Sequence, residues 1–122
     1  MIVFQNVSKI YDGCTALDKV NFSVDPKEFI SLAGPSGAGK STILKLLIGE
    51  ERPSKGKVFL DKQNIHLVKD GELPKFRRKI GMVFQDFRLL PQKTAYENIA
   101  FAMEAAGKTP GEIEEDVPQV LE

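Results

Sequence analysis

One stretch decides the fold of this 122-residue chain: Gly34-Pro35-Ser36-Gly37-Ala38-Gly39-Lys40-Ser41. It matches the pattern G-x-x-x-x-G-K-S/T at every fixed position. Residues 29–33 before it are almost wholly apolar and predict a buried strand. After it, apolar side chains recur at helical spacing over residues 40–48, and Gly49 follows where a helix often ends. A strand, a glycine-rich loop and a helix in this order are typical of a loop that binds phosphate through its backbone.

The chemistry of this loop follows from its residue types. Glycines tolerate positive φ and let backbone N–H groups approach an anion without a Cβ in the way. The start of the helix adds unpaired N–H groups and the positive end of its dipole. We expect the Lys40 ammonium at the outer phosphates of a nucleotide and the Ser41 hydroxyl as a ligand of Mg²⁺. The alternative is a glycine-rich turn with a surface lysine. The predicted phosphate-binding residues are Gly34, Pro35, Ser36, Gly37, Ala38, Gly39, Lys40, Ser41 and Thr42.

The remaining sequence indicates an α/β fold, with strands early in the chain and helices accumulating at its end. Asp12-Gly13 predicts a turn between two segments rich in β-branched and aromatic residues. Thr94, with Glu97 three positions later, has the spacing of a helix capping box. Further strands are expected at residues 1–7, 16–24, 58–60 and 80–84, and further helices at residues 72–79, 95–106 and 110–122.

Length and composition limit the class of protein. A chain of 122 residues is enough for one small domain, because it buries roughly two thirds of its unfolded surface. Its 17 basic and 17 acidic residues cancel, which argues against nucleic-acid binding through bulk positive charge. Cys14 is the single cysteine, expected to be small filler in the core and to fit a reducing compartment. The sequence shows no signal peptide and no apolar stretch near the roughly 20 residues of a membrane span, so we expect a cytoplasmic chain.

The phosphate-loop pattern and two residues at fixed distances from it resemble the nucleotide-binding domain of ABC (ATP-binding cassette) ATPases. Tyr11 lies 29 positions before Lys40, where this family carries an aromatic residue that stacks on adenine. Gln85 lies 45 positions after Lys40 and resembles the family's Q-loop glutamine, whose side-chain oxygen is a ligand for Mg²⁺. Taken alone, Tyr11 would be an ordinary half-buried aromatic residue, and Gln85 a solvated residue at a strand end. The family spacing favours the functional interpretation of both.

Within the family, the segment after Gln85 resembles ATP-binding subunits that act with a membrane partner in cell division. Residues 86–89, Asp-Phe-Arg-Leu, carry this similarity, whereas much of the surrounding sequence is common to importers and lipoprotein-release ATPases. The resemblance implies ATP and Mg²⁺ as ligands, a homodimer in the complete domain, no nucleic-acid partner, and a place at the inner face of the cell membrane through a membrane subunit. The candidate residues for docking to that subunit are Phe87, Leu89, Leu90 and Tyr96. Core packing between the two lobes of the domain is the alternative for these side chains.

The resemblance covers only the first part of the family domain, so we expect an incomplete ABC-type ATPase. Residues 1–91 would form the β-subdomain and the phosphate-loop core through the Q-loop, and residues 92–122 the start of the helical subdomain. The sequence contains no Leu-Ser-Gly-Gly signature, no apolar strand ending in Asp-Glu and no switch histidine, so no catalytic residue of the family is expected. His66, the one histidine, is expected on the surface without a catalytic role.

Three functions other than a cell-division subunit stay open. The first is the ATP-binding subunit of an importer or a lipoprotein-release complex. The second is a nucleotide-binding module that does not hydrolyse its ligand, because the residues for hydrolysis are not in this sequence. The third is a small-molecule kinase, and the family spacing of Tyr11 and Gln85 argues against it.

Overall fold

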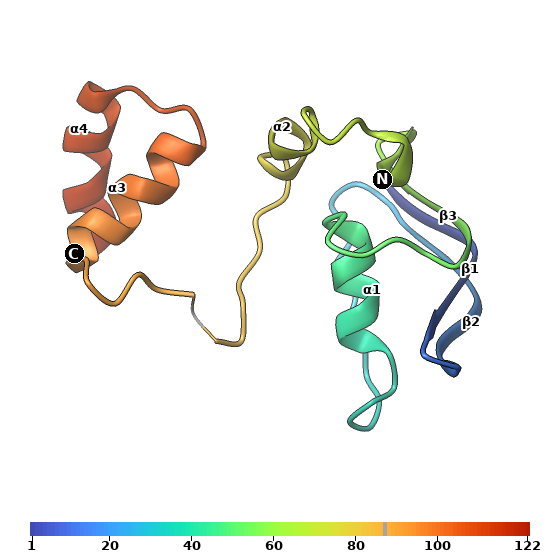
Figure 1. The fold of residues 1–122 in the computed structure, drawn as a ribbon. Helices are drawn as coiled ribbons and strands as arrows, with labels where there is room; N and C mark the ends of the chain where they lie inside the picture. Colours follow the sequence, from blue (N-terminus) through green and yellow to red (C-terminus); the bar gives the residue numbers. More distant parts are fainter. Residues whose placement is uncertain (87) are drawn as a thin grey trace. The chain divides into compact units, whose positions relative to one another are not determined.

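The structure, a computed structural model, describes residues 1–86 and 88–122, so the predicted docking residue Phe87 lies outside the described residues. The chain divides into two compact units, Met1–Ile80 and Gly81–Glu122 (Figure 1). Each unit is a body with its own packing. The subdomain boundary that the sequence placed after residue 91 stays a prediction about the family domain.

The first unit begins with a β-hairpin. Strands β1 (Ile2–Tyr11) and β2 (Cys14–Val24) pair in antiparallel fashion. Asp12 and Gly13 between them have φ of 43° and 84°, which is the two-residue turn whose twist suits a hairpin. The predicted turn and its two strands are confirmed. Cys14 is exposed, so the expectation of a buried cysteine was wrong, because this residue directly follows the turn that closes the hairpin.

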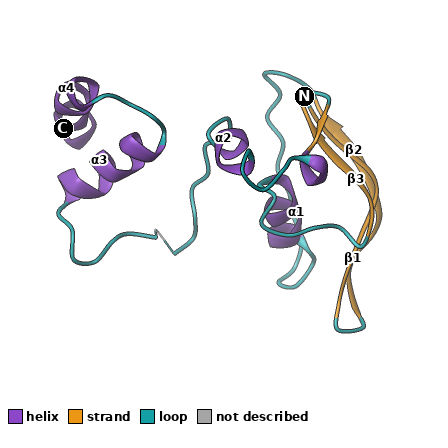
Figure 2. Ribbon diagram, turned by 45° about the horizontal axis from the view of Figure 1, so that its top comes forward, coloured by secondary structure: helices purple, strands orange, loops and turns teal. Residues whose placement is uncertain are grey.

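Two further strands complete, within the described residues, a four-stranded antiparallel sheet in the order β2-β1-β3-β4. Strands are drawn in orange in Figure 2. β3 (Lys55–Leu60) pairs with β1, and the short β4 (Gln63–Asn64) pairs with β3. At Gly56, φ is 85° and a side chain would collide with the Asn6 carbonyl oxygen. Glycine is therefore required where β3 approaches β1. A 3₁₀ helix, η1 (Ile65–Leu67), follows β4.

Helix α1 (Lys40–Leu47), predicted over residues 40–48, packs against one face of this sheet (Figure 2). Leu46 from the helix joins Phe4 and Val58 from the sheet, and the Phe4 ring stacks on that of another sheet residue, Phe22, with centroids 4.5 Å apart. Full burial of one such side chain contributes about 1.5–3 kcal/mol. The buried core consists of Phe4, Val7, Leu17, Leu46, Val58, Ile65, Val68 and Phe76.

The short helix α2 (Leu73–Arg77) fixes the end of α1. The Arg77 side chain donates hydrogen bonds to the carbonyl oxygens of Ile48 at 2.9 Å and Gly49 at 3.1 Å. These bonds satisfy carbonyl groups that a helix end leaves unpaired. The helix predicted at residues 72–79 is thus confirmed in a shorter form, and its arginine supports α1.

Two predicted strands are wrong. Residues 29–33 and residues 80–84 both lie outside every strand, and the side chains of Phe29 and Val83 are 93% and 96% exposed. An apolar run becomes a strand only where a neighbouring strand satisfies its backbone hydrogen bonds. The sheet of the described residues has β2 and β4 at its edges, and neither apolar run pairs with them. The sequence pattern identified apolar segments without indicating a partner for them.

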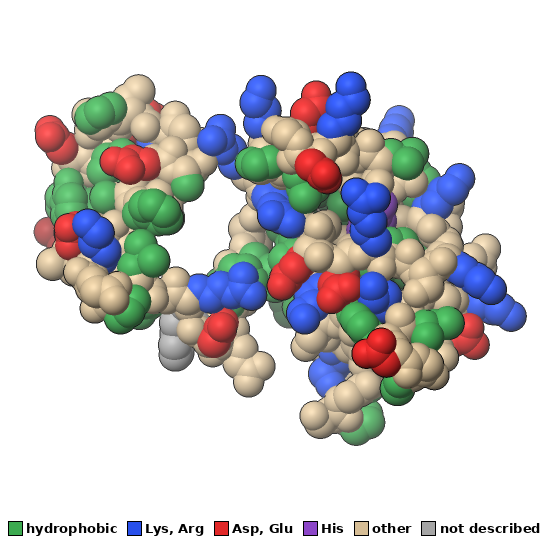
Figure 3. Space-filling model, in the orientation of Figure 1, with side chains coloured by type: hydrophobic (Ala, Val, Ile, Leu, Met, Phe, Trp, Pro, Cys, Tyr) green, Lys and Arg blue, Asp and Glu red, His purple; other side chains and the backbone are tan. Residues whose placement is uncertain are grey.

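The second unit contains, within its described residues, the helices α3 (Ala95–Ala105) and α4 (Pro110–Leu121), which pack together. Each begins with a complete capping box, so both predicted helices are confirmed. Gly107 between them has φ of 87°. Hydrophobic side chains remain on the surface of this unit (Figure 3), among them Phe101, which is 57% exposed. None of the described helices is long and apolar enough to cross a bilayer.

Candidate functional site

The loop at residues 34–41 leads into α1 and is held against the hairpin. Gly37 and Gly39 have φ of 81° and 83°, a conformation that glycine adopts without steric cost. Gly39 immediately precedes the helix, and a Cβ at this residue would lie 2.6 Å from the Ala16 carbonyl oxygen and 2.7 Å from Leu17 Cδ2. Glycine at position 39 therefore lets the loop pack directly on β2.

The Lys40 side chain turns back into the loop. Its Nζ donates hydrogen bonds to the carbonyl oxygens of Gly34 and Pro35, both at 2.7 Å. The Ala38 N–H donates to the Pro35 oxygen at 3.2 Å and closes the curve. No described side chain caps α1, and its first turn contains no acidic residue, so free N–H groups and the positive end of the helix dipole adjoin the ammonium. Such a set of donors is suited to binding an anion.

The two predicted Mg²⁺ ligands lie in different units. Ser41 is exposed in the first turn of α1, followed by the half-buried Thr42. Gln85 is exposed in a turn of the second unit, and its role as a ligand of the same ion as Ser41 stays a prediction. In residues 1–86 and 88–122, no three side chains of His, Cys, Asp or Glu gather where they would hold a metal ion.

Tyr11, the predicted adenine-stacking residue, is the last residue of β1 and is half-buried. It belongs to the hairpin on which the loop packs, since Leu17, which adjoins Gly39, pairs with Lys9 two residues before Tyr11. The Lys9 Nζ lies 4.7 Å from the centroid of the Tyr11 ring. The structure thus brings the loop and Tyr11 to the same hairpin.

Three predicted docking residues are exposed in the second unit. The side chains of Leu89, Leu90 and Tyr96 are 68%, 36% and 38% exposed. Within this unit they are available for contacts with other surfaces, and their docking role stays a prediction.

The Asn98 side chain, whose role the sequence pattern did not predict, connects the loop before α3 to the helix through hydrogen bonds. Its Oδ1 accepts the Leu90 N–H at 2.7 Å, and its Nδ2 donates to the carbonyl oxygen of Thr94 at 2.9 Å and to those of Leu90 and Lys93 at 3.2 Å. An asparagine in the first turn of a helix, where side-chain to backbone bonds are common, was the available signal. This residue fixes the backbone that carries Leu90.

The two capping-box glutamates are stabilised in their charged form. The hydrogen bond from the Thr94 backbone N–H lowers the pKa of Glu97, and Lys93 adds to the effect. The hydrogen bond from Lys108, at 2.7 Å, lowers the pKa of Glu112 to about 2. At the start of both helices of the second unit, the charged form of the glutamate is therefore favoured, and it also gains from the positive end of the helix dipole.

His66 is half-buried in η1, and its Nε2 is buried without a hydrogen-bond partner among the described residues. The expectation of a surface histidine was wrong, because the neighbouring Ile65 is part of the core and draws this turn inward. Burial lowers the pKa of His66, and the positive charges of Arg52 and Lys9 add to that effect.

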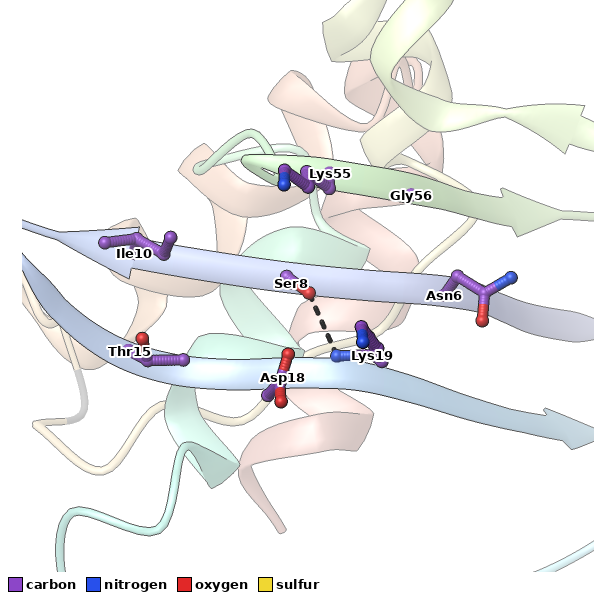
Figure 4. Close-up of a pocket in the computed structure, with 8 residues that line it drawn as sticks. All are labelled: Asn6, Ser8, Ile10, Thr15, Asp18, Lys19, Lys55 and Gly56. Carbon is purple, nitrogen blue, oxygen red and sulfur yellow. Dashed lines mark hydrogen bonds between the residues drawn. The ribbon is translucent and has the colours of Figure 1, made fainter.

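Two hollows of the first unit have no residue of the loop in their lining. A hollow of about 640 Å³ lies on the sheet and is lined by polar residues such as Ser8, whose Oγ accepts the Lys19 N–H at 2.9 Å (Figure 4). A second hollow of about 430 Å³ lies between the sheet and α1 and is lined by apolar residues including Phe29 and Leu44. The loop itself is an open cradle, which suits a ligand held mainly by backbone N–H groups.

Comparison with known proteins shows to which family this chain belongs. The family model described as ABC transporter matches residues 17–122. The chain belongs to the ABC transporter family. That match includes the whole phosphate loop and Gln85, and it starts after Tyr11. Family membership, which the sequence indicated through the loop and the spacing of two further residues, is confirmed.

Relatives of this ABC transporter chain include proteins named cell division ATP-binding protein FtsE. That of Bacillus subtilis (strain 168) is 45% identical over 123 residues, and that of Mycobacterium tuberculosis (strain ATCC 25618 / H37Rv) is 47% identical over 124 residues. Each alignment covers 100% of this chain and 54% of the relative. The chain therefore spans about half the length of the relatives that it matches.

Solved structures of ABC cassettes have the same fold. The cassette MJ0796, in a dimeric post-hydrolysis state bound to ADP and Pi, has a TM-score of 0.87 and 35% identity, covering 98% of this chain and 55% of that one. Another dimeric structure of MJ0796 has a TM-score of 0.85 and 37% identity, covering 94% of this chain and 53% of that one. The predicted fold class, the first part of an ABC nucleotide-binding domain, is confirmed.

Proposed function

We propose that this ABC transporter chain binds ATP with Mg²⁺, with the phosphates held by residues 34–42. The observation that carries the proposal is the Lys40 ammonium, 2.7 Å from two loop carbonyl oxygens at the start of α1. The ammonium and the backbone N–H groups beside it are donors only, so they favour an oxyanion over a neutral ligand. Oxyanions at the start of a helix also gain from its dipole.

Tyr11 is proposed as the part of the site that distinguishes a nucleotide from free phosphate. Its ring offers a face on which a purine stacks, an interaction worth about 1–3 kcal/mol per base. The contact between Gly39 and β2 supports this role, because it seats the loop on the hairpin that ends in Tyr11. One ligand would then contact the loop with its phosphates and Tyr11 with its base.

Mg²⁺, when bound, neutralises charge on the phosphates. We assign the Ser41 hydroxyl as one protein ligand and the Gln85 side-chain oxygen as a second. Both are neutral oxygens, and Mg²⁺ commonly binds few protein ligands together with phosphate oxygens and water. Both side chains are exposed in their own units.

The complete protein is proposed to be the ATP-hydrolysing subunit of an FtsE-like complex in cell division. The names of its relatives support this role, and the dimeric cassettes support a homodimer. We further propose an FtsX-like membrane partner that holds the protein at the cytoplasmic face of the cell membrane. The membrane subunit of an importer or lipoprotein-release complex is the alternative partner. The proposed docking residues are Phe87, Leu89, Leu90 and Tyr96.

Binding without turnover is proposed for these 122 residues alone. Phosphoryl transfer to water needs a positioned base and stabilisation of charge on the γ-phosphate. The family's signature, its Asp-Glu strand end and its switch histidine are not in the sequence. Phosphate release by the chain, abolished in Lys40→Ala, would contradict this part of the proposal.

Isothermal titration with MgATP tests the binding proposal. Lys40→Ala removes the loop ammonium, and Lys45→Ala is its matched control, since Lys45 lies in the last turn of the same helix. We expect saturable binding by the unchanged chain and by Lys45→Ala, and at least a tenfold loss of affinity in Lys40→Ala. Equal affinity of both variants, with circular dichroism confirming that both are folded, would contradict the assignment.

A further inference from the structure

Lys9 is buried to an unusual degree for a lysine. Its side chain is only 13% exposed, although lysine is rarely buried unless its charge is paired. Its Nζ meets two oxygen partners, a carboxylate oxygen of Glu51 at 2.8 Å and the carbonyl oxygen of Arg52 at 2.8 Å. The same Nζ lies 4.7 Å from the centroid of the Tyr11 ring. Two contacts from the segment after α1 therefore hold one ammonium beside the aromatic ring at the end of β1.

Glu51 anchors this ammonium from the end of α1. Its side chain is 28% exposed, and its backbone N–H donates to the Lys45 carbonyl oxygen at 3.2 Å, just past the last turn of the helix. The hydrogen bond from Lys9 holds the pKa of Glu51 below its ordinary value, and the Tyr11 hydroxyl contributes to the same shift. Glu51 thus holds the cation that lies beside the Tyr11 ring.

We propose that Lys9 and Glu51 are positioning residues for Tyr11, and that they fix its ring as the platform for an adenine base. The proposal rests on the proposed function, since it presumes that the base of the nucleotide stacks on Tyr11. A cation near an aromatic ring is attracted by the ring's quadrupole. The contact with Lys9 restrains the ring beside the hairpin turn. Neither residue needs to touch the nucleotide.

α1 and the hairpin connect the phosphate loop to Tyr11. α1 begins at the phosphate loop and ends beside Glu51, which holds Lys9 and thereby Tyr11. The hairpin of β1 and β2 also connects the loop to Lys9, because Gly39 packs on β2 and Lys9 lies on β1. Helix and hairpin together would set the position of the base platform relative to the loop.

The composition of the chain permits a direct test. It contains two tyrosines and no tryptophan, so in a Tyr96→Phe background the tyrosine emission comes from Tyr11 alone. Two probes are titrated with Mg²⁺ into this background: ATP, which has a base, and inorganic tripolyphosphate, which has none. ATP is expected to quench Tyr11 emission on saturation, and tripolyphosphate to bind without the quench.

The decisive variant is Lys9→Met, which keeps an apolar stem and removes the charge. Lys55→Met is the matched control, since Lys55 is an exposed lysine of the same sheet (Figure 4). We expect Lys9→Met to weaken ATP binding about two- to fivefold and to reduce the quench, with tripolyphosphate affinity unchanged. Lys9→Arg should restore both, and Glu51→Gln should reproduce the loss in part.

Four results would overturn the inference. One is that Lys9→Met and Glu51→Gln both keep the ATP affinity and the quench of the background chain, while circular dichroism shows that both variants are folded. Another is equal weakening of ATP and tripolyphosphate, which would indicate a general loss of charge or of structure. The third is failure of the background chain to bind either probe, which removes the proposed function and this inference with it. ATP binding without a quench would count against the Tyr11 platform and leave phosphate binding intact.

Discussion

At residue 39 the backbone of the phosphate loop touches the hairpin, and two nearby glycines separate the effects of conformation and contact. Gly37 and Gly39 have nearly the same φ, 81° and 83°. A Cβ at Gly37 would meet nothing within 4 Å, whereas one at Gly39 would lie 2.6 Å from the Ala16 oxygen. The difference in free energy of unfolding between alanine variants at these two positions therefore measures how tightly the loop packs on β2.

Alanine at each position should lower the free energy of unfolding to a different extent. Gly37→Ala pays only for its left-handed conformation, about 1–2 kcal/mol. Gly39→Ala adds displacement of the backbone, and about 2–5 kcal/mol in total is expected. Urea denaturation of the two variants checks this prediction. Equal losses would mean that Gly39 does not pack on β2.

Burial of His66 should make the stability of the chain depend on pH. Burial lowers its pKa, so between its folded pKa and the ordinary value near 6.5 the unfolded chain binds more protons. The stability contribution of neutral His66 is complete above about pH 6.5 and is lost as the pH falls through the folded pKa. The urea midpoint should therefore fall between pH 7.5 and pH 5.5, a range above the ordinary titration of carboxylates. His66→Gln should flatten this dependence, and an equally steep decrease in that variant would refute the assignment.

Among the elements, α3 shows how a loop residue depends on a helix. Its capping box fixes the first turn, and Asn98 in that turn extends four hydrogen bonds to residues 90–94. The helix therefore orders the backbone that precedes it, including Leu90, a proposed docking residue.

Asn98→Ala should loosen this loop more than Asn98→Asp. Alanine loses all four bonds, whereas aspartate keeps an oxygen that accepts the Leu90 N–H. Each lost bond contributes about 0.5–1.5 kcal/mol. Hydrogen exchange at the Leu90 amide is the measurement, and protection should be lost in Asn98→Ala and largely kept in Asn98→Asp. Unchanged protection in the alanine variant would show that another contact orders the loop.

Over the whole molecule, the sequence predicted the elements whose signals are local. The β1–β2 hairpin followed from Asp12-Gly13, α1 from its periodicity, and α3 and α4 from the changes in pattern around them. The phosphate loop followed from the spacing of glycines and lysine. Residues 29–33 and 80–84 failed as strands because strand formation depends on a partner, and an apolar run does not indicate whether that partner is present.

The sequence did not predict the contacts that complete the site, and the physical reason is a different one. Lys9 meets Glu51, and Gly39 meets Ala16, only after the chain has folded. Asn98 resembles any polar residue of a first turn until its loop closes on it. Residue types predict which groups bind phosphate, whereas tertiary packing decides which groups hold them in place.

In the proposed function, backbone N–H groups of residues 34–41 bind the phosphates of a nucleotide. Amide chemical shifts of the ¹⁵N-labelled chain, recorded during titration with MgATP, test it most directly. We expect saturable shifts concentrated at the loop amides and at Tyr11, with only the loop shifts remaining when tripolyphosphate replaces ATP. Saturable shifts elsewhere with the loop amides unmoved, or no shifts at millimolar MgATP in a folded chain, would contradict it.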